Sequence, residues 1–393
     1  MAEGIPVKKE LIRWAIDRSG RATGELAHAF PRLDEWQRGD RRPTLKQLEA
    51  FARETMTPLG YLFLDSPPDE ALQLPDFRTV GDTPIGRPSP NLIDTVQAMR
   101  RRQAWMREYV IEEGLGPLAF VGSGRTVRNV ASLAAKIRDT LGLAADWAEN
   151  VATWEDALRA LRDATERTGI VVAASGMVGL NTHRTLDPQE FRGFVLCDDF
   201  APLIFVNAGD SKSAQMFTLA HELAHIWVGR DGLFNLIRMV PHEDEIERFC
   251  NQVAAEFLVP RHKLLARWSE LKGAAKPFHN IGRAFKVSPL VAARRAWDLD
   301  LIPRKKFFAF YEEEQAAWRR RKAEDKSRVR KGGPDFYQVQ DVRLGRRFAY
   351  AVVRAAREGR LLYREAYELT DLRGETFNKY AARLLQRMKN DRR

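Results

Sequence analysis

The stretch FTLAHELAHI at residues 217–226 contains the pattern H-E-x-x-H within apolar residues that recur at helical spacing. Residues at positions i and i+4 share one face of a helix, so the imidazoles of His221 and His225 can reach one cation about 2.0–2.1 Å away. Glu222 is better placed to take a proton from metal-bound water than to ligate the ion. An exposed helix with two unrelated histidines fits less well, because the apolar residues predict burial, where histidines need partners. This stretch therefore predicts a buried helix with two metal ligands and a general base.

A catalytic zinc site takes three protein ligands and keeps a fourth position for water. The segment IERFCNQVAAEFLVP at residues 246–260 predicts a second helix, with Glu247 beside its apolar face and Asn251 one turn further on. We expect Glu247 to be the third ligand and Asn251 to orient the site through a hydrogen bond. Three other residues compete with Glu247 as the third ligand: His242, Glu243 and Glu245. The alternative interpretation of these three is an acidic, solvated helix start.

Together the two segments resemble the ImmA/IrrE family of bacterial zinc metallopeptidases. That family shows a strand ending in Asn, then a helix with HELxH, then E-x-x-A-N-x-F-A-A-x-L-L-x-P. Here Asn207 follows a predicted strand, and residues 247–260 fit the last motif with Cys250 in place of Ala and Val253 in place of Phe. Both are changes of packing residues, and we expect Cys250 to be a packed thiol. The resemblance covers residues 170–303.

The resemblance implies that His221, His225 and Glu247 hold zinc, with Glu222 as general base. Members of the family with known roles cleave, or trigger the loss of, helix-turn-helix transcriptional repressors. We therefore expect a zinc-dependent endopeptidase that cuts one specific protein, a repressor or antitoxin, in a regulatory, mobile-element or stress response. Manganese is an alternative ion, because sites of nitrogen and carboxylate ligands accept several divalent metals.

Three short apolar runs at residues 170–173, 194–196 and 203–206 predict strands, and the last two are joined by a hairpin turn. We expect this hairpin to dock the substrate as an added strand. His183, in the preceding loop, is a candidate contact to the substrate or transition state, although a lone loop histidine is more often incidental. Asn207, at the end of the third strand, is a second candidate contact.

Residues 8–64 resemble a repressor-like helix-turn-helix domain of the Xre type, on the landmarks ELA, WQRG, PT and QL. Only eight residues separate Ala27 from Trp36, about four fewer than the DNA-reading form uses. This shortening falls on the turn and the start of the recognition helix, so it favours protein contact over the reading of bases. The candidate contacts to DNA phosphates are Arg38, Arg41 and Arg42.

The fold class predicted is α+β and mostly helical: a zincin-like metallopeptidase core, with a small sheet plus the HEXXH helix, between helical N- and C-terminal modules. The segment from Trp318 to Lys331 holds eight Lys or Arg against two acids. It is interpreted as a solvated helix or linker, with contact to a nucleic-acid backbone as the alternative. The expected parts are a helix-turn-helix module (1–65), a Pro-rich linker (66–90), a helical segment (91–169), the peptidase core with a small helix-turn-helix-like tail (170–303), a basic linker (304–333) and a helical C-terminal module (334–393).

Composition restricts the class of protein but does not name the activity. The 393 residues carry a net charge of +11, which is compatible with nucleic acid, an acidic membrane surface or an acidic protein as partner. The sequence begins without an apolar signal segment, has no run long enough to span a membrane and holds two cysteines, so we expect a cytoplasmic protein without a disulfide framework. The alternative function is a DNA-binding regulator or antitoxin-like protein whose metal site is structural or vestigial.

Overall fold

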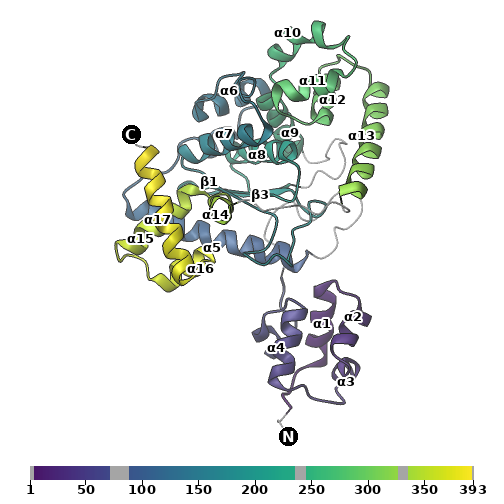
Figure 1. The fold of residues 1–393 in the computed structure, drawn as a ribbon, viewed down its shortest axis with the longest axis vertical. Coiled ribbons are helices and arrows are strands. Elements are labelled where there is room, and N and C mark those ends of the chain that lie inside the picture. The colour runs from purple at the N-terminus through teal and green to yellow at the C-terminus, as the bar shows by residue number, and fades with distance from the viewer. Residues whose placement is uncertain (1–3, 71–87, 235–244, 326–334, 392–393) are drawn as a thin grey trace. The chain divides into compact units, whose positions relative to one another are not determined.

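The computed structural model describes residues 4–70, 88–234, 245–325 and 335–391 (Figure 1). The chain divides into two compact units, residues 1–97 and 98–393. The finer domain boundaries expected from composition are not tested by this division and stay predictions. Most of the Pro-rich linker, residues 71–87, lies outside the described residues.

The first unit is a small helical domain with its own core. Its elements are α1 (Lys9–Ser19), α2 (Thr23–Ala29), α3 (Leu33–Arg38), α4 (Leu45–Glu54) and the 3-10 helix η1 (Leu59–Phe63). The rings of Phe30, Trp36 and Phe51 meet edge-on or tilted at centroid distances of 5.7–6.1 Å. Thr44 and Gln47 form a capping box that starts α4 directly after Pro43.

The second unit combines a four-stranded sheet with helices. Its first half contains α5 (Pro90–Glu112), which begins in the first unit, α6 (Val130–Leu141), α7 (Trp154–Arg167), β1 (Val171–Ser175), β2 (Gly193–Leu196), β3 (Leu203–Asn207), α8 (Lys212–Val228), β4 (Gly232–Phe234) and α9 (Glu245–Leu258). The strand order is β1-β3-β2-β4, with β1 parallel to β3 and β2 antiparallel to both of its neighbours. The three predicted strands and their hairpin are confirmed, and β4 is an addition.

The strand order overturns one expectation about the substrate. In the sheet β3 lies between β1 and β2, and β2 lies between β3 and β4. Both strands of the hairpin therefore use their main-chain groups for pairing on two sides. An added strand needs an unpaired edge, so the hairpin at residues 193–206 cannot dock a substrate in that way.

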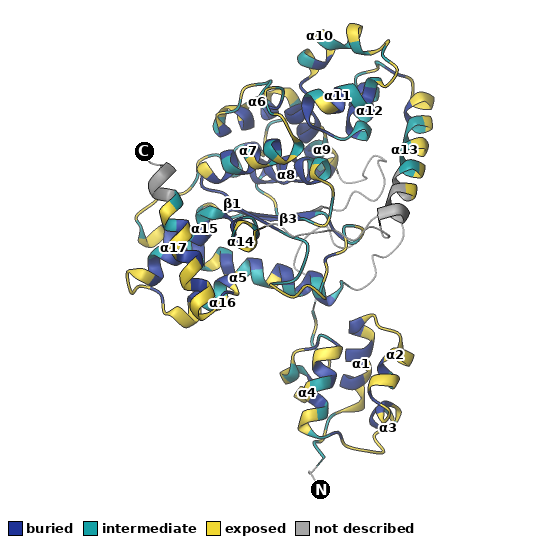
Figure 2. Cartoon of the chain, in the orientation of Figure 1, coloured by how far each residue is buried: buried dark blue, intermediate teal, exposed yellow. Residues whose placement is uncertain are grey.

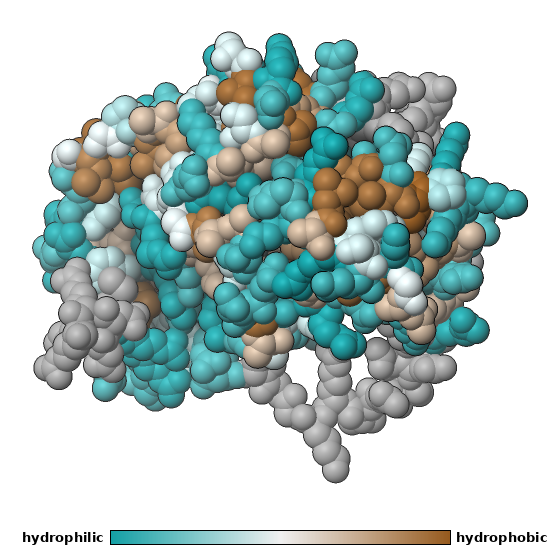
Figure 3. Space-filling view, turned by 90° about the horizontal axis from the view of Figure 1, so that it is seen from above, coloured by the Kyte–Doolittle hydropathy of each residue, from teal (hydrophilic) through white to brown (hydrophobic). Residues whose placement is uncertain are grey.

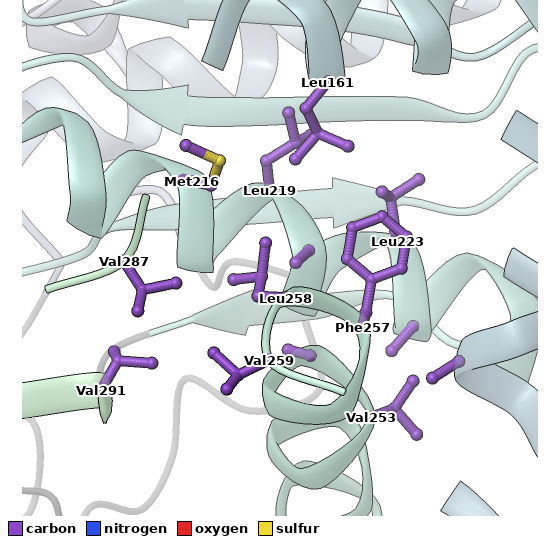
Figure 4. Close-up of a cluster of buried hydrophobic side chains, with 14 of the residues drawn as sticks. Leu161, Met216, Leu219, Leu223, Val253, Phe257, Leu258, Val259, Val287 and Val291 are labelled. Carbon is purple, nitrogen blue, oxygen red and sulfur yellow. The ribbon is translucent and has the colours of Figure 1, made fainter. Parts of the chain in front are cut away.

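The main core lies between the sheet and the helices α6 to α9, which Figure 1 shows on one side of β1 and β3. Apolar side chains of α8 and α9 gather there, among them Leu219, Leu223, Val253 and Phe257 (Figure 4). Each of these side chains is at most 1% exposed, and full burial of such a side chain contributes about 1.5–3 kcal/mol. The 3.6-residue spacing of these apolar positions is the pattern that predicted both helices.

A helical segment follows the core, with α10 (Arg261–Leu271), α11 (Pro277–Phe285), α12 (Pro289–Asp298) and α13 (Arg304–Asp325). The pair α11–α12 corresponds to the helix-turn-helix-like element that was expected here. The beginning of the expected basic linker is helical instead, because α13 places Phe307 in the core, where its ring stacks on Trp297 at 5.0 Å. The Lys/Arg count was made over residues 318–331, so it gave no information on the apolar first turns of α13.

The C-terminal module consists of α14 (Phe336–Leu344), α15 (Arg346–Arg357), α16 (Tyr363–Thr370) and α17 (Gly374–Asp391). Two buried arginines that share one exposed carboxylate connect it to the rest of the second unit. Arg102 of α5 and Arg343 of α14 both bind the carboxylate of Asp371, at 3.0 and 2.7 Å. Gly345, between α14 and α15, has φ +78° and approaches β1 so closely that a Cβ would lie 2.8 Å from the Val172 carbonyl oxygen.

None of the described helices is both long and apolar enough to cross a membrane. On the face seen in Figure 3, apolar side chains gather in separate patches between hydrophilic ones.

Candidate metal centre

Helix α8 carries the H-E-x-x-H pattern through the centre of the second unit. Ser211 caps its start by accepting the N–H of Ala214, and Gly229 ends it in the left-handed conformation, at φ +76°. Figure 2 shows α8 mostly in the colour of buried residues. His221 and Glu222 are 0% exposed and His225 is 1% exposed, so the predicted burial of the motif is confirmed.

The side chains of His221, His225 and Glu247 converge on one point between α8 and α9. The two Nε2 atoms lie 3.0 Å apart. The carboxylate oxygens of Glu247 lie 3.2 Å from Nε2 of His221 and 2.9 Å from Nε2 of His225. Two nitrogens and a carboxylate that converge in this way could hold a divalent metal ion.

Burial and neighbouring charges shift the pKa values of the three donors in different directions. Burial lowers the pKa of His221, which favours the neutral imidazole that binds metals. Burial alone would raise the pKa of Glu247, but the two imidazoles outweigh it and hold that pKa far below its usual range. Glu247 is therefore ionised, as a carboxylate ligand must be. The pKa of His225 is raised well above its usual value, because Cys250 and Glu247 outweigh the effect of its burial.

Residues on α9 surround the two histidines. The side chain of Asn251 lies against His221, which fits the orienting role expected for it. The side chain of Cys250 lies against His225, and this thiol is 0% exposed. Sequence reasoning had placed Cys250 on the apolar face and missed this contact, although its position three residues after Glu247 puts the two side chains on neighbouring parts of the helix surface.

The competing ligands do not join the donors among the described residues. Glu245 is exposed at the start of α9, and His242 and Glu243 lie outside the described residues. Within the described parts of the chain, the group of His, Cys, Asp or Glu side chains that could hold a metal is His221, His225 and Glu247.

The two candidate substrate contacts, His183 and Asn207, are not members of this donor group. His183 is exposed, and its backbone N–H donates to Oδ1 of Asn181 at 3.0 Å. Asn207 is 0% exposed, and its amide donates to the Phe191 carbonyl at 3.1 Å and accepts from the Gly209 N–H at 2.9 Å. Asn207 thus holds the turn after β3, and a contact of either residue with a substrate stays a prediction.

In the first unit, the three candidate phosphate contacts are exposed arginines. Arg38 pairs with Asp40 at 2.9 Å, and Arg41 approaches Glu35 at 3.7 Å. The helix in the recognition position, α3, has six residues, with Asp34 and Glu35 in its first turn. Acidic side chains at that end repel DNA phosphates. This charge adds to the shortening as an argument against base reading, and contact with nucleic acid stays a prediction.

A family model matches the part of the chain that contains the candidate metal ligands. Residues 165–296 match the family model of the IrrE N-terminal-like domain (Peptidase_M78), which confirms the resemblance to the ImmA/IrrE family over these residues. Residues 344–383 match a model described as a domain of unknown function (DUF8813). A comparison with curated proteins finds no match.

Among solved structures, a Mycobacterium tuberculosis transcriptional regulator matches at 14% identity with a TM-score of 0.26. The match covers 49% of this chain and 51% of that structure, so this chain spans about half the length of its structural neighbour. A similarity this low carries no argument about fold or function.

Proposed function

We propose that this chain is a zinc-dependent endopeptidase that cleaves one specific protein, a helix-turn-helix repressor or an antitoxin. The observation that carries the proposal is the convergence of His221, His225 and Glu247 beside a buried Glu222. The donor set fits zinc, because two imidazole nitrogens and one carboxylate oxygen leave one of its four positions open. The match of residues 165–296 to a peptidase family supports the same class of activity.

A bound zinc ion would supply Lewis-acid activation of water and of the peptide carbonyl. Glu222 is the general base: its carboxylate takes the proton of the attacking water and hands it to the nitrogen of the leaving amine. His221, His225 and Glu247 hold the ion, and Asn251 orients His221. The second proton transfer, to the leaving amine, needs no further residue, because Glu222 becomes an acid once it has accepted the first proton.

The sheet favours one place for the substrate backbone. Among the described strands, β1 and β4 are the edges, and the C-terminal module packs against β1. The edge strand β4 contains Gly232, which lies against the ring of His225. An extended peptide that pairs with β4 would therefore run beside the metal ligands.

Co-expression with helix-turn-helix regulators tests the proposal. Glu222→Gln removes the base and keeps the size of the side chain, so cleavage should fall by about 10²–10⁴-fold while zinc content stays stoichiometric. Glu245→Gln, at an exposed glutamate of α9, is the matched control and should cut like the wild type. Undiminished cleavage by Glu222→Gln would refute the mechanism. A protein that cuts nothing and binds duplex DNA tightly through residues 1–65 would favour the regulator function instead.

A further inference from the structure

The edge strand β4 approaches a metal ligand at a glycine. If Gly232 carried a Cβ, that atom would lie 3.0, 3.1 and 3.3 Å from three ring atoms of His225: Cε1, Nδ1 and Nε2. Such distances are shorter than ordinary van der Waals contact, so the ring would have to shift by a few tenths of an ångström. The main chain of β4 thus lies directly on the imidazole, with no side chain between them.

The backbone of Gly232 does not itself require glycine. Its φ lies outside the left-handed region, so an L residue could adopt the conformation. Glycine inside a strand costs about 0.5–1 kcal/mol relative to alanine, and it often marks a place where another group approaches closely. Here the approaching group is His225, and its ring accounts for the glycine.

A second glycine on the neighbouring strand extends the same surface. Gly232 pairs with Val195 of β2, and Gly193 lies two residues before Val195, so both glycines face the same side of the sheet. A Cβ at Gly193 would lie 2.5 Å from Cγ2 of Thr218 and 3.4 Å from Oε1 of Glu222. Thr218, Glu222 and His225 follow one another at i, i+4 and i+7, which is one stripe of α8. Because neither glycine has a side chain, these three polar side chains of α8 have room between the helix and the sheet.

We propose that Gly232 is a positioning residue for the metal ligand His225. The β4 backbone sets the plane of the imidazole, so that Nε2 points at the donors His221 and Glu247 rather than past them. The inference rests on the metal site of the proposed function and adds to it the element that orients one of the ligands. Gly193 is a less selective probe, because a Cβ there would also lie 2.8 Å from the Phe205 carbonyl oxygen.

The test is the metal affinity of Gly232→Ala in the full chain, measured by zinc competition with a chromophoric chelator. The dissociation constant should rise by about 10-fold or more, as it does when a group that orients a ligand is lost. The absorption spectrum of the Co²⁺-loaded protein should also change, because a displaced imidazole alters the ligand field. Gly209→Ala is the matched control, since its Cβ would meet three atoms at 3.1–3.3 Å that include no metal ligand. It should leave both readouts unchanged.

Each outcome bears on the inference. Equal zinc affinity and equal Co²⁺ spectra for Gly232→Ala and wild type overturn the positioning role and leave the proposed function standing. A wild-type chain that binds no metal overturns both. If Gly232→Ala does not fold, the double variant Gly232→Ala/His225→Ala must fold, because the ring that crowds the new methyl group is gone. Failure of the double variant to fold, under conditions in which His225→Ala alone folds, overturns the inference.

Discussion

Glu166 is a buried carboxylate whose ionisation should destabilise the protein above neutral pH. It lies near the end of α7 and is 7% exposed. Its Oε1 accepts the N–H of Arg347 at 3.3 Å, at the start of α15. Burial raises the pKa of Glu166 from 4.5 to about 7, although Arg162 and the Arg347 N–H act in the opposite direction. Glu166 therefore connects α7 to the C-terminal module through a group that titrates near neutrality.

The direction of the pH effect follows from the raised pKa. Between pH 4.5 and 7 the folded chain keeps a proton on Glu166 that the unfolded chain has released, so the free energy of unfolding falls as the pH rises through this range. Each pH unit is worth 1.36 kcal/mol, so the rise in pKa corresponds to about 3 kcal/mol lost by pH 8. Below about pH 4.5 both states are protonated and the loss disappears.

Glu166→Gln isolates this effect, because the amide oxygen still accepts the Arg347 N–H and cannot ionise. At pH 8 the variant should be more stable than wild type by about 3 kcal/mol, and at pH 5 by less than about 1 kcal/mol. Urea unfolding followed by tryptophan fluorescence measures both, and with a slope of about 3 kcal/mol/M the midpoint at pH 8 should rise by about 1 M. Glu155→Gln, at an exposed position of the same helix, is the control and should shift neither midpoint.

Two results would refute this reasoning. A variant less stable than wild type at pH 8 would mean that the pairing of ionised Glu166 with Arg162 outweighs the cost of its burial. An equal difference at pH 5 and pH 8 would mean that packing, and not ionisation, separates the two proteins.

Two further predictions concern the metal and the core. Glu247→Gln removes the charge of one ligand, so its zinc content, measured by atomic spectrometry, should drop. Metal at 1,000 times its dissociation constant stabilises a folded protein by about 4 kcal/mol. Removal of the metal with a chelator should therefore lower the melting temperature of the wild type. An equal response of the variant to chelation would count against Glu247 as ligand. Phe257→Ala should lower the free energy of unfolding by about 3–5 kcal/mol, because the ring is 1% exposed between α8 and α9. Leu265→Ala, at a 42% exposed side chain of α10, should cost less than about 0.5 kcal/mol in the same urea experiment.

Local sequence patterns predicted many of the helices and strands of the fold. The spacing of apolar residues around His221 and in residues 246–260 predicted α8 and α9, because a helix that packs on a core repeats its apolar positions every 3.6 residues. Short β-branched and aromatic runs predicted β1, β2 and β3 in the same way. The pairing of His221 with His225 was equally local, since residues four apart on a helix necessarily share a face.

Features that depend on pairing between distant segments were missed. The three residues of β4 include Gly232, which has low strand propensity, and they form a strand only because β2 pairs with them. The helical start of α13 was missed, because the prediction of a linker rested on the Lys/Arg content of residues 318–331. The hairpin was assigned the wrong role, because sequence reasoning identifies strands without saying which of them are interior to the sheet.

By itself the sequence determined which side chains are candidates for the chemistry: two histidines at helical spacing, a glutamate between them and acidic residues on a following helix. Only the tertiary structure decided which acidic residue meets the histidines. The packing of α9 on α8 turns Glu247 inward to within 3.2 Å of them and leaves Glu245 exposed. The packing of α8 on the sheet places Gly232 of β4 against the ring of His225. The sequence states side-chain type and spacing directly. How closely two elements approach each other depends on how all the apolar faces are buried together.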